Sequence, residues 1–199
     1  MKQRKLLSQR HPIFYYLSVN LRRIQRYRKW YFNNNIFASK VEKDLLPKRI
    51  KKHQSILIRK LGDSDKQLQI NKVVNLKIAA KKIDKIIIHP GETFSFCKLI
   101  GKPTSKKGYV MGMELSMGKA RPGIGGGICQ IANMLHWLIL HSPLTVIEKS
   151  NHSFDPFPDE GRTLPFGSGA AIFYNYVDFQ FKNDTQQIFQ IHLQVTDTH

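Results

Sequence analysis

Three consecutive glycines, Gly125, Gly126 and Gly127, stand shortly before Cys129 in the sequence. The apolar residues that follow recur at helical spacing, which predicts a helix beginning at or beside Cys129. The first N–H groups of a helix have no partners within it, and the helix dipole makes that end partly positive. Such a position favours a thiolate, so we predict a lowered pKa and a nucleophilic role for Cys129.

A cysteine nucleophile works with a base, and His152 is the nearest downstream candidate. It follows a strand-like run, from which its ring could reach the start of the helix. Asp155 would orient the imidazole from its far side. Backbone N–H groups near Gly127 and Cys129, together with the amide of Gln130, would stabilise a developing oxyanion. These residues predict acyl transfer or amide hydrolysis.

Other interpretations stay open for the same residues. His136 lies on nearly the same face of the predicted helix, but roughly 10 Å along its axis from Cys129, and His141 lies further still. Asp178 is a second candidate to orient His152. The alternative role for Cys129 is that of a small buried hydrophobe at a tight corner. Zinc held by Cys129 and two histidines is the least favoured alternative, because no zinc-ligand spacing supports it. We predict no metal and no cofactor.

A turn followed by aromatic residues forms a second candidate cluster. Glu92 lies beside the turn and is either catalytic or a turn cap, while Phe94 and Phe96 follow it. Together with the glycine loop, these residues would line a groove for an extended peptide or glycan. They give the alternative function, a non-catalytic binding module. Cys97 has no glycine-rich helix start before it, which indicates a packed thiol.

The formal charge of +18 is concentrated at the N-terminus. Residues 1–60 carry 17 of the 32 lysines and arginines but only two acidic residues. Aromatic side chains alternate with arginines between positions 13 and 37, a pattern typical of a basic helix at an anionic lipid surface. We expect residues 1–40 to contact such a surface. The alternatives are an arm packed on the main domain and, less favoured, a nucleic-acid backbone.

The sequence also predicts the cellular location of the protein. No apolar run approaches the roughly 20 residues of a spanning helix, and no small-residue cleavage site follows the basic start. Two cysteines cannot form a disulfide framework. We therefore expect a cytoplasmic protein that lies peripherally at the inner face of the membrane.

Periodicity predicts the main elements of the body. Apolar residues at helical intervals predict a helix over 71–83, and a β-branched run predicts a strand over 86–88. Twelve of the 13 glycines lie at or after position 91, which predicts a loop-rich second half. Residues 171–181 and 187–195 are predicted to form a terminal strand pair.

These elements predict an α+β fold. A glycine-rich loop feeds a central helix packed on a small antiparallel sheet, with a basic helical N-terminal arm. We expect the arm and a linker over 1–60 and the α+β domain over 61–199.

Several of these motifs, in this order, resemble the VanW family, which takes its name from an accessory protein of B-type glycopeptide-resistance clusters. The resemblance covers about residues 70–199 strongly. The basic aromatic arm more weakly resembles that of the short family members without a signal sequence. It rests on the segments 90–96, 101, 108–109, 125–130, 138–148, His152 and 178–184. It implies an association with vancomycin resistance and peptidoglycan, and hence a cell-wall peptide or precursor as substrate. Because the GGGxCQ string is the family's hallmark, it also implies a functional role for Cys129.

Overall fold

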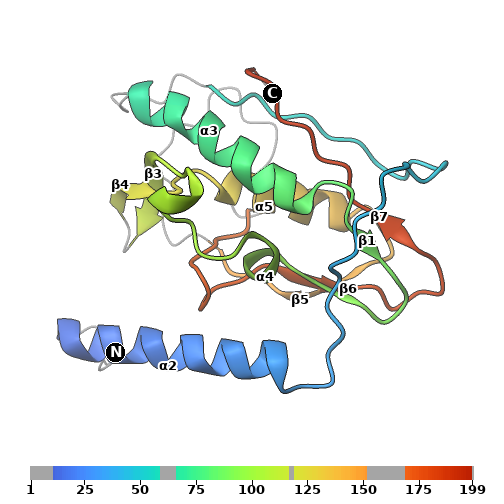
Figure 1. The fold of residues 1–199 in the computed structure, drawn as a ribbon, viewed down its shortest axis with the longest axis horizontal. Coiled ribbons are helices and arrows are strands. Elements are labelled where there is room, and N and C mark those ends of the chain that lie inside the picture. The colour runs from blue at the N-terminus through green and yellow to red at the C-terminus, as the bar shows by residue number, and fades with distance from the viewer. Residues whose placement is uncertain (1–10, 59–65, 117–118, 152–168, 199) are drawn as a thin grey trace, which may run out of the picture. The chain divides into compact units, whose positions relative to one another are not determined.

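The computed structural model of the chain describes residues 11–58, 66–116, 119–151 and 169–198 (Figure 1). The chain divides into two compact units, Met1–Asn35 and Ile36–His199. The first unit holds α2 (Pro12–Tyr31). The second holds, in order, α3 (Lys66–Ile83), β1 (Ile87–Ile88), β2 (Thr93–Ser95), α4 (Phe96–Ile100), η1 (Ser105–Lys107), β3 (Met111–Ser116), β4 (Lys119–Ile124), α5 (Cys129–Ile139), β5 (Thr145–Glu148), β6 (Gln180–Lys182) and β7 (Phe189–Gln190).

The helix α2 has a sharply defined start. His11 is its N-cap, and the Nδ1 atom of that side chain accepts a hydrogen bond of 3.3 Å from the N–H of Ile13. Pro12 occupies the first helical position, where a missing N–H costs nothing. This confirms the predicted basic helix in the N-terminal arm.

Within the described part of the second unit, the strands form three small antiparallel sheets. In the largest, β6 lies between β2 and β5, so that Phe181 is opposite both Phe94 and Val146. β1 pairs with β7, and β3 pairs with β4 as a hairpin. The fold is therefore α+β, as predicted.

A single apolar core joins the largest sheet to α3 and α5. The rings of Phe94 and Phe181 stack with their centroids 4.5 Å apart, and both side chains are fully buried. Leu76 of α3 and Leu135 of α5 are buried in the same cluster. The central helix thus packs where the sequence predicts.

The predicted terminal strand pair is wrong. β6 pairs with β2 and β5, whereas β7 pairs with β1. Asn183 accounts for the separation, because its side-chain amide donates hydrogen bonds to the carbonyls of Ile88 and Gln187 (3.0 and 2.6 Å). Its Oδ1 atom accepts from the N–H and hydroxyl of Thr185. This turn directs the two strands toward different partners instead of toward each other.

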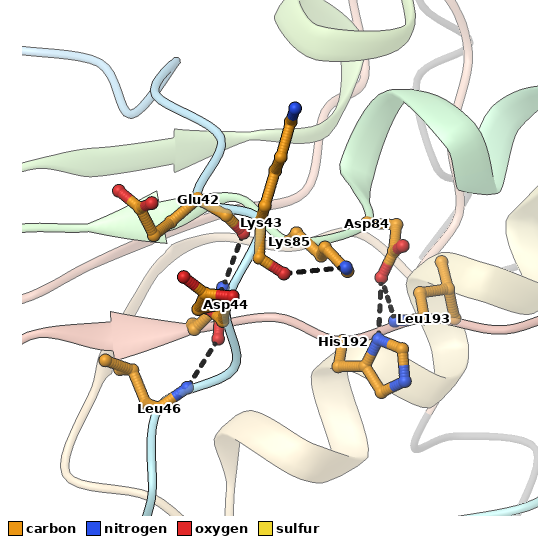
Figure 2. Close-up of polar contacts among 9 residues, drawn as sticks. Glu42, Lys43, Asp44, Leu46, Asp84, Lys85, His192 and Leu193 are labelled. Atoms are coloured by element: carbon orange, nitrogen blue, oxygen red, sulfur yellow. Dashed lines mark hydrogen bonds and ion pairs between the residues drawn. The ribbon is translucent and has the colours of Figure 1, made fainter.

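Residues 36–58 belong to the second unit, so the division between units precedes the predicted boundary at residue 60. Phe37 and Val41 form isolated bridges with Thr93 and Ile86. Figure 2 shows how residues 42–46 are held: Lys85 Nζ donates to the Lys43 carbonyl over 2.7 Å. The segment predicted as a linker is thus anchored on the body.

Candidate functional site

Cys129 is the first residue of α5, which confirms the predicted helix start. The glycine loop continues directly into the helix through two tight turns. The N–H of Gln130 donates to the Gly127 carbonyl, and that of Ile131 donates to the Ile128 carbonyl, each over 3.1 Å. Two of the N–H groups in the first turn of α5 are therefore already bonded to carbonyls of the loop.

The glycine loop crosses β3 with almost no space between the two backbones. A Cβ atom on Gly126 would lie 2.2 Å from the carbonyl carbon of Gly112, and one on Gly112 would lie 2.4 Å from the Gly126 oxygen. Asn75 of α3 fixes the crossing: its Nδ2 donates to the carbonyls of Gly126 and Val110 (2.9 and 3.0 Å). Its Oδ1 accepts from the N–H of Val110. Asn75 is fully buried, so this clamp is shielded from water.

The other two glycines are also covered by this chain. Gly125 and Gly127 have positive φ angles of 79° and 92°, which glycine adopts without strain. A Cβ atom on Gly125 would meet the ring of Pro103 at 2.5 Å, and one on Gly127 would meet the stem of Lys72 at 2.2 Å. The sequence predicts that this glycine loop lines a groove for a peptide or glycan, which would need open space beside the glycines. In the structure, the chain itself fills most of it.

The electrostatic setting of Cys129 differs from the prediction. Burial raises the pKa of the Cys129 thiol above its ordinary value, because the thiolate loses solvation. The charge of Lys72 and the N–H groups of Cys129 and Gln130 act in the opposite direction, but burial outweighs them. The prediction of a lowered pKa is therefore wrong, although the thiolate-stabilising groups on which it rested are present.

The side chain of Gln130 is engaged by an extended segment of the chain. Its Nε2 donates to Ser55 Oγ over 3.1 Å and to the Ile56 carbonyl over 3.3 Å. Lys72 Nζ donates to the carbonyl of Leu57. The Gln130 amide, predicted as a second oxyanion donor, thus holds residues 55–56 beside the start of α5.

The predicted base and its orienting carboxylate, His152 and Asp155, lie outside the described residues. Within the described ranges, no imidazole forms a hydrogen bond with Cys129. His136 is buried and meets the ring of Phe179 edge-on, with 5.7 Å between centroids. His141 Nδ1 lies 2.8 Å from the Trp137 carbonyl oxygen at the other end of α5. Neither alternative histidine is placed to act on the sulfur.

The cluster around Glu92 is structural. The Glu92 carboxylate accepts a hydrogen bond of 2.8 Å from the N–H of His89, so it caps the turn. Phe94 and Phe96 have no exposed surface. The predicted role of these two rings in ligand binding is therefore wrong, because both rings fill the core and present no surface to a ligand. Alternating aromatic residues after a turn predicted a groove wall, but both faces of β2 are buried.

The carboxylate of Asp178 organises this part of the core. The sequence suggested it only as a possible partner of His152. Asp178 is fully buried and accepts hydrogen bonds from the hydroxyl of Ser95 (2.6 Å) and the N–H of Cys97 (2.8 Å). It also accepts from the N–H of Phe179 and the amide of Gln180. Its oxygens are thus occupied in joining β2 and α4 to β6.

Residues 11–58, 66–116, 119–151 and 169–198 contain no group of three or more His, Cys, Asp or Glu side chains able to hold a metal ion. None of the helices within these ranges combines the length and apolar character of a membrane span.

Residues 71–199 match the protein family described as VanW like protein, which covers the body from α3 onward. The chain belongs to the VanW family. The VanW relatives include the vancomycin B-type resistance protein VanW of Enterococcus faecalis (strain ATCC 700802 / V583), 34% identical over 98% of this chain and 70% of that protein. The uncharacterised protein YoaR of Bacillus subtilis (strain 168) is 31% identical over 57% of this chain and 36% of its own length. No solved structure is significantly similar to the chain.

Lys72→Met tests the electrostatic balance at the VanW-family cysteine. Methionine keeps the stem that covers Gly127 but removes a charge that lowers the Cys129 pKa. The pH midpoint of Cys129 alkylation by iodoacetamide is expected to lie above that of the urea-unfolded chain, and to move further up in the variant. Peptide mass spectrometry over a pH series measures both midpoints.

Lys77→Met is the matched control, since Lys77 lies on the same helix and pairs with Asp197 over 2.6 Å. It is expected to leave the midpoint unchanged. A folded midpoint at or below the unfolded one would contradict the assigned balance.

Proposed function

We propose that this VanW-family chain uses Cys129 as the nucleophile of an acyl transferase or amidase that acts on a cell-wall peptide or its precursor, in connection with vancomycin resistance. One observation carries the proposal: the sulfur lies at a helix start where Lys72 and two backbone N–H groups all favour its ionised form. The name of the Enterococcus faecalis relative supports the biological setting. The raised pKa means that the resting enzyme holds a thiol and needs a base during reaction.

In the proposed reaction, His152 removes the proton from the thiol, and Asp155 orients its ring. The sulfur adds to the carbonyl carbon of a peptide bond, and the C–N bond breaks. The leaving amine takes the proton from His152, which leaves a thioester on Cys129. A second amine or water then attacks the thioester, and the S–C bond breaks to restore the thiol. An amine gives acyl transfer, and water gives hydrolysis.

Removal of the nucleophile tests this proposal. The full chain is incubated with peptidoglycan fragments released by a muramidase, and products and protein adducts are followed by mass spectrometry. Wild type is expected to form new peptide products and a hydroxylamine-sensitive adduct on Cys129. Cys129→Ala is expected to reduce the rate on the order of 10³-fold or more.

Cys97→Ala is the matched control, because Cys97 is buried and its thiol lies 3.6 Å from the Val177 carbonyl. It is expected to keep the activity. A wild-type chain that leaves the fragments unchanged, or a Cys129→Ala variant as active as wild type, contradicts the proposal.

The second candidate is a non-catalytic module that binds a peptide or glycan. The burial that raises the pKa of Cys129 favours this alternative, because a protonated thiol is a weak nucleophile. In that case Cys129→Ser leaves binding to the fragments and any resistance phenotype intact. The enzyme proposal requires the loss of that phenotype, so one variant separates the two candidates.

We further propose that the arm, residues 1–40, contacts an anionic membrane surface. The chain has no acidic residue before Glu42. On α2, exposed apolar side chains recur at intervals of four and seven residues, as on an interfacial helix: Ile13, Leu17, Ile24 and Tyr31 are 60%, 51%, 57% and 67% exposed. Arginines between them supply attraction to anionic lipids.

The double variant Leu17→Gln/Ile24→Gln interrupts this stripe without changing the charge. It is expected to weaken binding to phosphatidylglycerol vesicles by about tenfold or more, since each change removes a buried aliphatic side chain from the lipid. Vesicle sedimentation measures the loss. The control Asn33→Gln/Asn34→Gln is expected to bind as wild type does, and equal binding by both double variants would refute the proposed lipid contact.

A further inference from the structure

A cavity of about 630 Å³ lies in the second unit. It is bounded by α5, by the C-terminal segment 188–196 and by the basic strap, which we define as residues 45–57. Gln130 is the lining residue next to Cys129. Its volume falls within the roughly 300–1,000 Å³ of small-molecule sites.

The inner wall of the cavity is aliphatic. Its lining residues include Met134, Leu138, Leu193 and Val195, which are partly buried, and Leu144, which is 9% exposed. Their side chains offer dispersion contacts and burial but no hydrogen bonds. A peptide seated against this inner wall would find no partners there for its backbone N–H and C=O groups, which is costly. A hydrocarbon chain carries no such groups, so the wall favours an alkyl ligand.

The outer wall of the cavity is cationic. Lys48, Arg49, Lys51 and Lys52 line it from the strap and are all exposed. Among the described residues that line the cavity, none is Asp or Glu. The excess of positive charge at the mouth is therefore not neutralised by a carboxylate of the wall, and it would attract an anionic head group.

The strap is held at its two ends. The N–H of Leu46 donates to Gln190 Oε1 over 3.0 Å. At the other end, Leu57 donates to the Thr198 carbonyl over 2.9 Å. In the part of the chain that the structure describes, no backbone hydrogen bond is made by residues 47–54. Lys51 and His53 instead contact the ring of Trp137 at 4.9 and 4.6 Å from its centroid. The four cations thus lie on a segment that is fixed at both ends and beside Trp137.

We infer that this cavity binds a single-chain anionic amphiphile. The hydrocarbon chain lies among the aliphatic side chains, and a phosphate or carboxylate head lies at the cations of the strap. This binding site goes beyond the proposed chemistry of Cys129 and does not depend on it. Cys129→Ala is accordingly expected to bind the amphiphile as wild type does, so failure of one proposal leaves the other standing.

Three soluble probes separate the contributions of the hydrocarbon chain and of the anionic head group of the ligand. They are octyl phosphate, neutral octyl glucoside and inorganic phosphate. Calorimetric titration of the full chain, with the amphiphiles below their micelle concentrations, is expected to give clear binding of octyl phosphate alone. The other two probes are expected to bind at least about tenfold more weakly. Burial and the nearby Lys51 hold the pKa of His53 below its ordinary value. Octyl phosphate, but not octyl glucoside, is expected to raise that pKa in an NMR titration.

Two variants test the two walls. Changing Lys48, Arg49, Lys51 and Lys52 to Gln is expected to reduce the affinity for octyl phosphate about tenfold or more. Its control changes Lys81, Lys82, Lys106 and Lys107, which lie elsewhere, to Gln. Met134→Trp fills the cavity from α5, whereas Leu140→Trp places the same ring on an exposed position of the adjoining turn. Only the former is expected to abolish binding.

The outcomes decide the proposal. Equal binding of octyl glucoside, or unchanged affinity in the strap variant, would overturn the anionic head group. Unchanged affinity in Met134→Trp would overturn the cavity as the site. Binding to phosphatidylglycerol vesicles identifies the source of the bound hydrocarbon. Met134→Trp lowers vesicle binding if the cavity takes an acyl chain from the bilayer. It leaves vesicle binding unchanged if the ligand is a free amphiphile.

Discussion

Gly126→Ala is expected to destabilise the fold by about 3 kcal/mol or more. The new methyl group would lie 2.2 Å from the Gly112 backbone, and backbone cannot rotate away as a side chain can. Separating the two segments would also stretch the bond from Asn75 to the Gly126 carbonyl, which is buried and has no water to replace it. Urea unfolding followed by circular dichroism measures the loss.

Gly123→Ala is the matched control three residues earlier. Its Cβ atom would meet the carboxylate of Glu114 at 2.5 Å, the movable end of a partly exposed side chain. The cost is therefore expected to stay below about 1 kcal/mol, even if the surface ion pair with Arg121 is lost. A similar loss for both variants would show that the crossing of the glycine loop over β3 is not the tight contact described above.

Asp178→Ala is expected to have the largest effect on stability, about 4 kcal/mol, which is a large share of the total for a domain of this size. The change leaves buried donors of Ser95, Cys97 and Gln180 without their acceptor. Asp178→Asn is expected to cost less, because one oxygen can still accept from backbone N–H groups and the Ser95 hydroxyl can reverse its role. Urea midpoints of the two variants, compared at constant m-value, measure this order.

Asp184→Ala controls for the loss of a carboxylate. Asp184 lies on the same part of the chain but is exposed, and it pairs with Lys182 over 2.7 Å. Little change in the urea midpoint is expected. Should Asp178→Ala unfold at the midpoint of Asp184→Ala, the buried network would not contribute as its geometry indicates.

The helices were predictable because their signals are local. The apolar spacing after Cys129 identifies α5, and that after residue 71 identifies α3, although α3 begins at Lys66. The pairing of the last strands was not predictable, because it depends on Asn183 reaching Ile88 across the fold. Local patterns carry no information about such distant contacts.

The chemical setting of the site was predictable only in part. The sequence places Cys129 at a helix start, because that position depends only on the residues next to it in the sequence. The burial that raises its pKa depends on how the chain packs, and no local pattern reveals it. Asn75 was missed for a related reason, because an asparagine within a helical pattern normally indicates the solvent face. Here that side chain is fully buried and holds the glycine loop.

The pairing of early strands with late ones has a consequence for biosynthesis. β1 and β2 leave the ribosome long before β7 and β6, and the Asn183 contact with Ile88 spans 95 positions. Until that stretch has been translated, the apolar edges of both early strands are open to solvent and to other nascent chains. Folding of this unit should therefore be slow and should wait for the synthesis of β6 and β7, and trigger-factor-like holding activity should raise the yield of native protein.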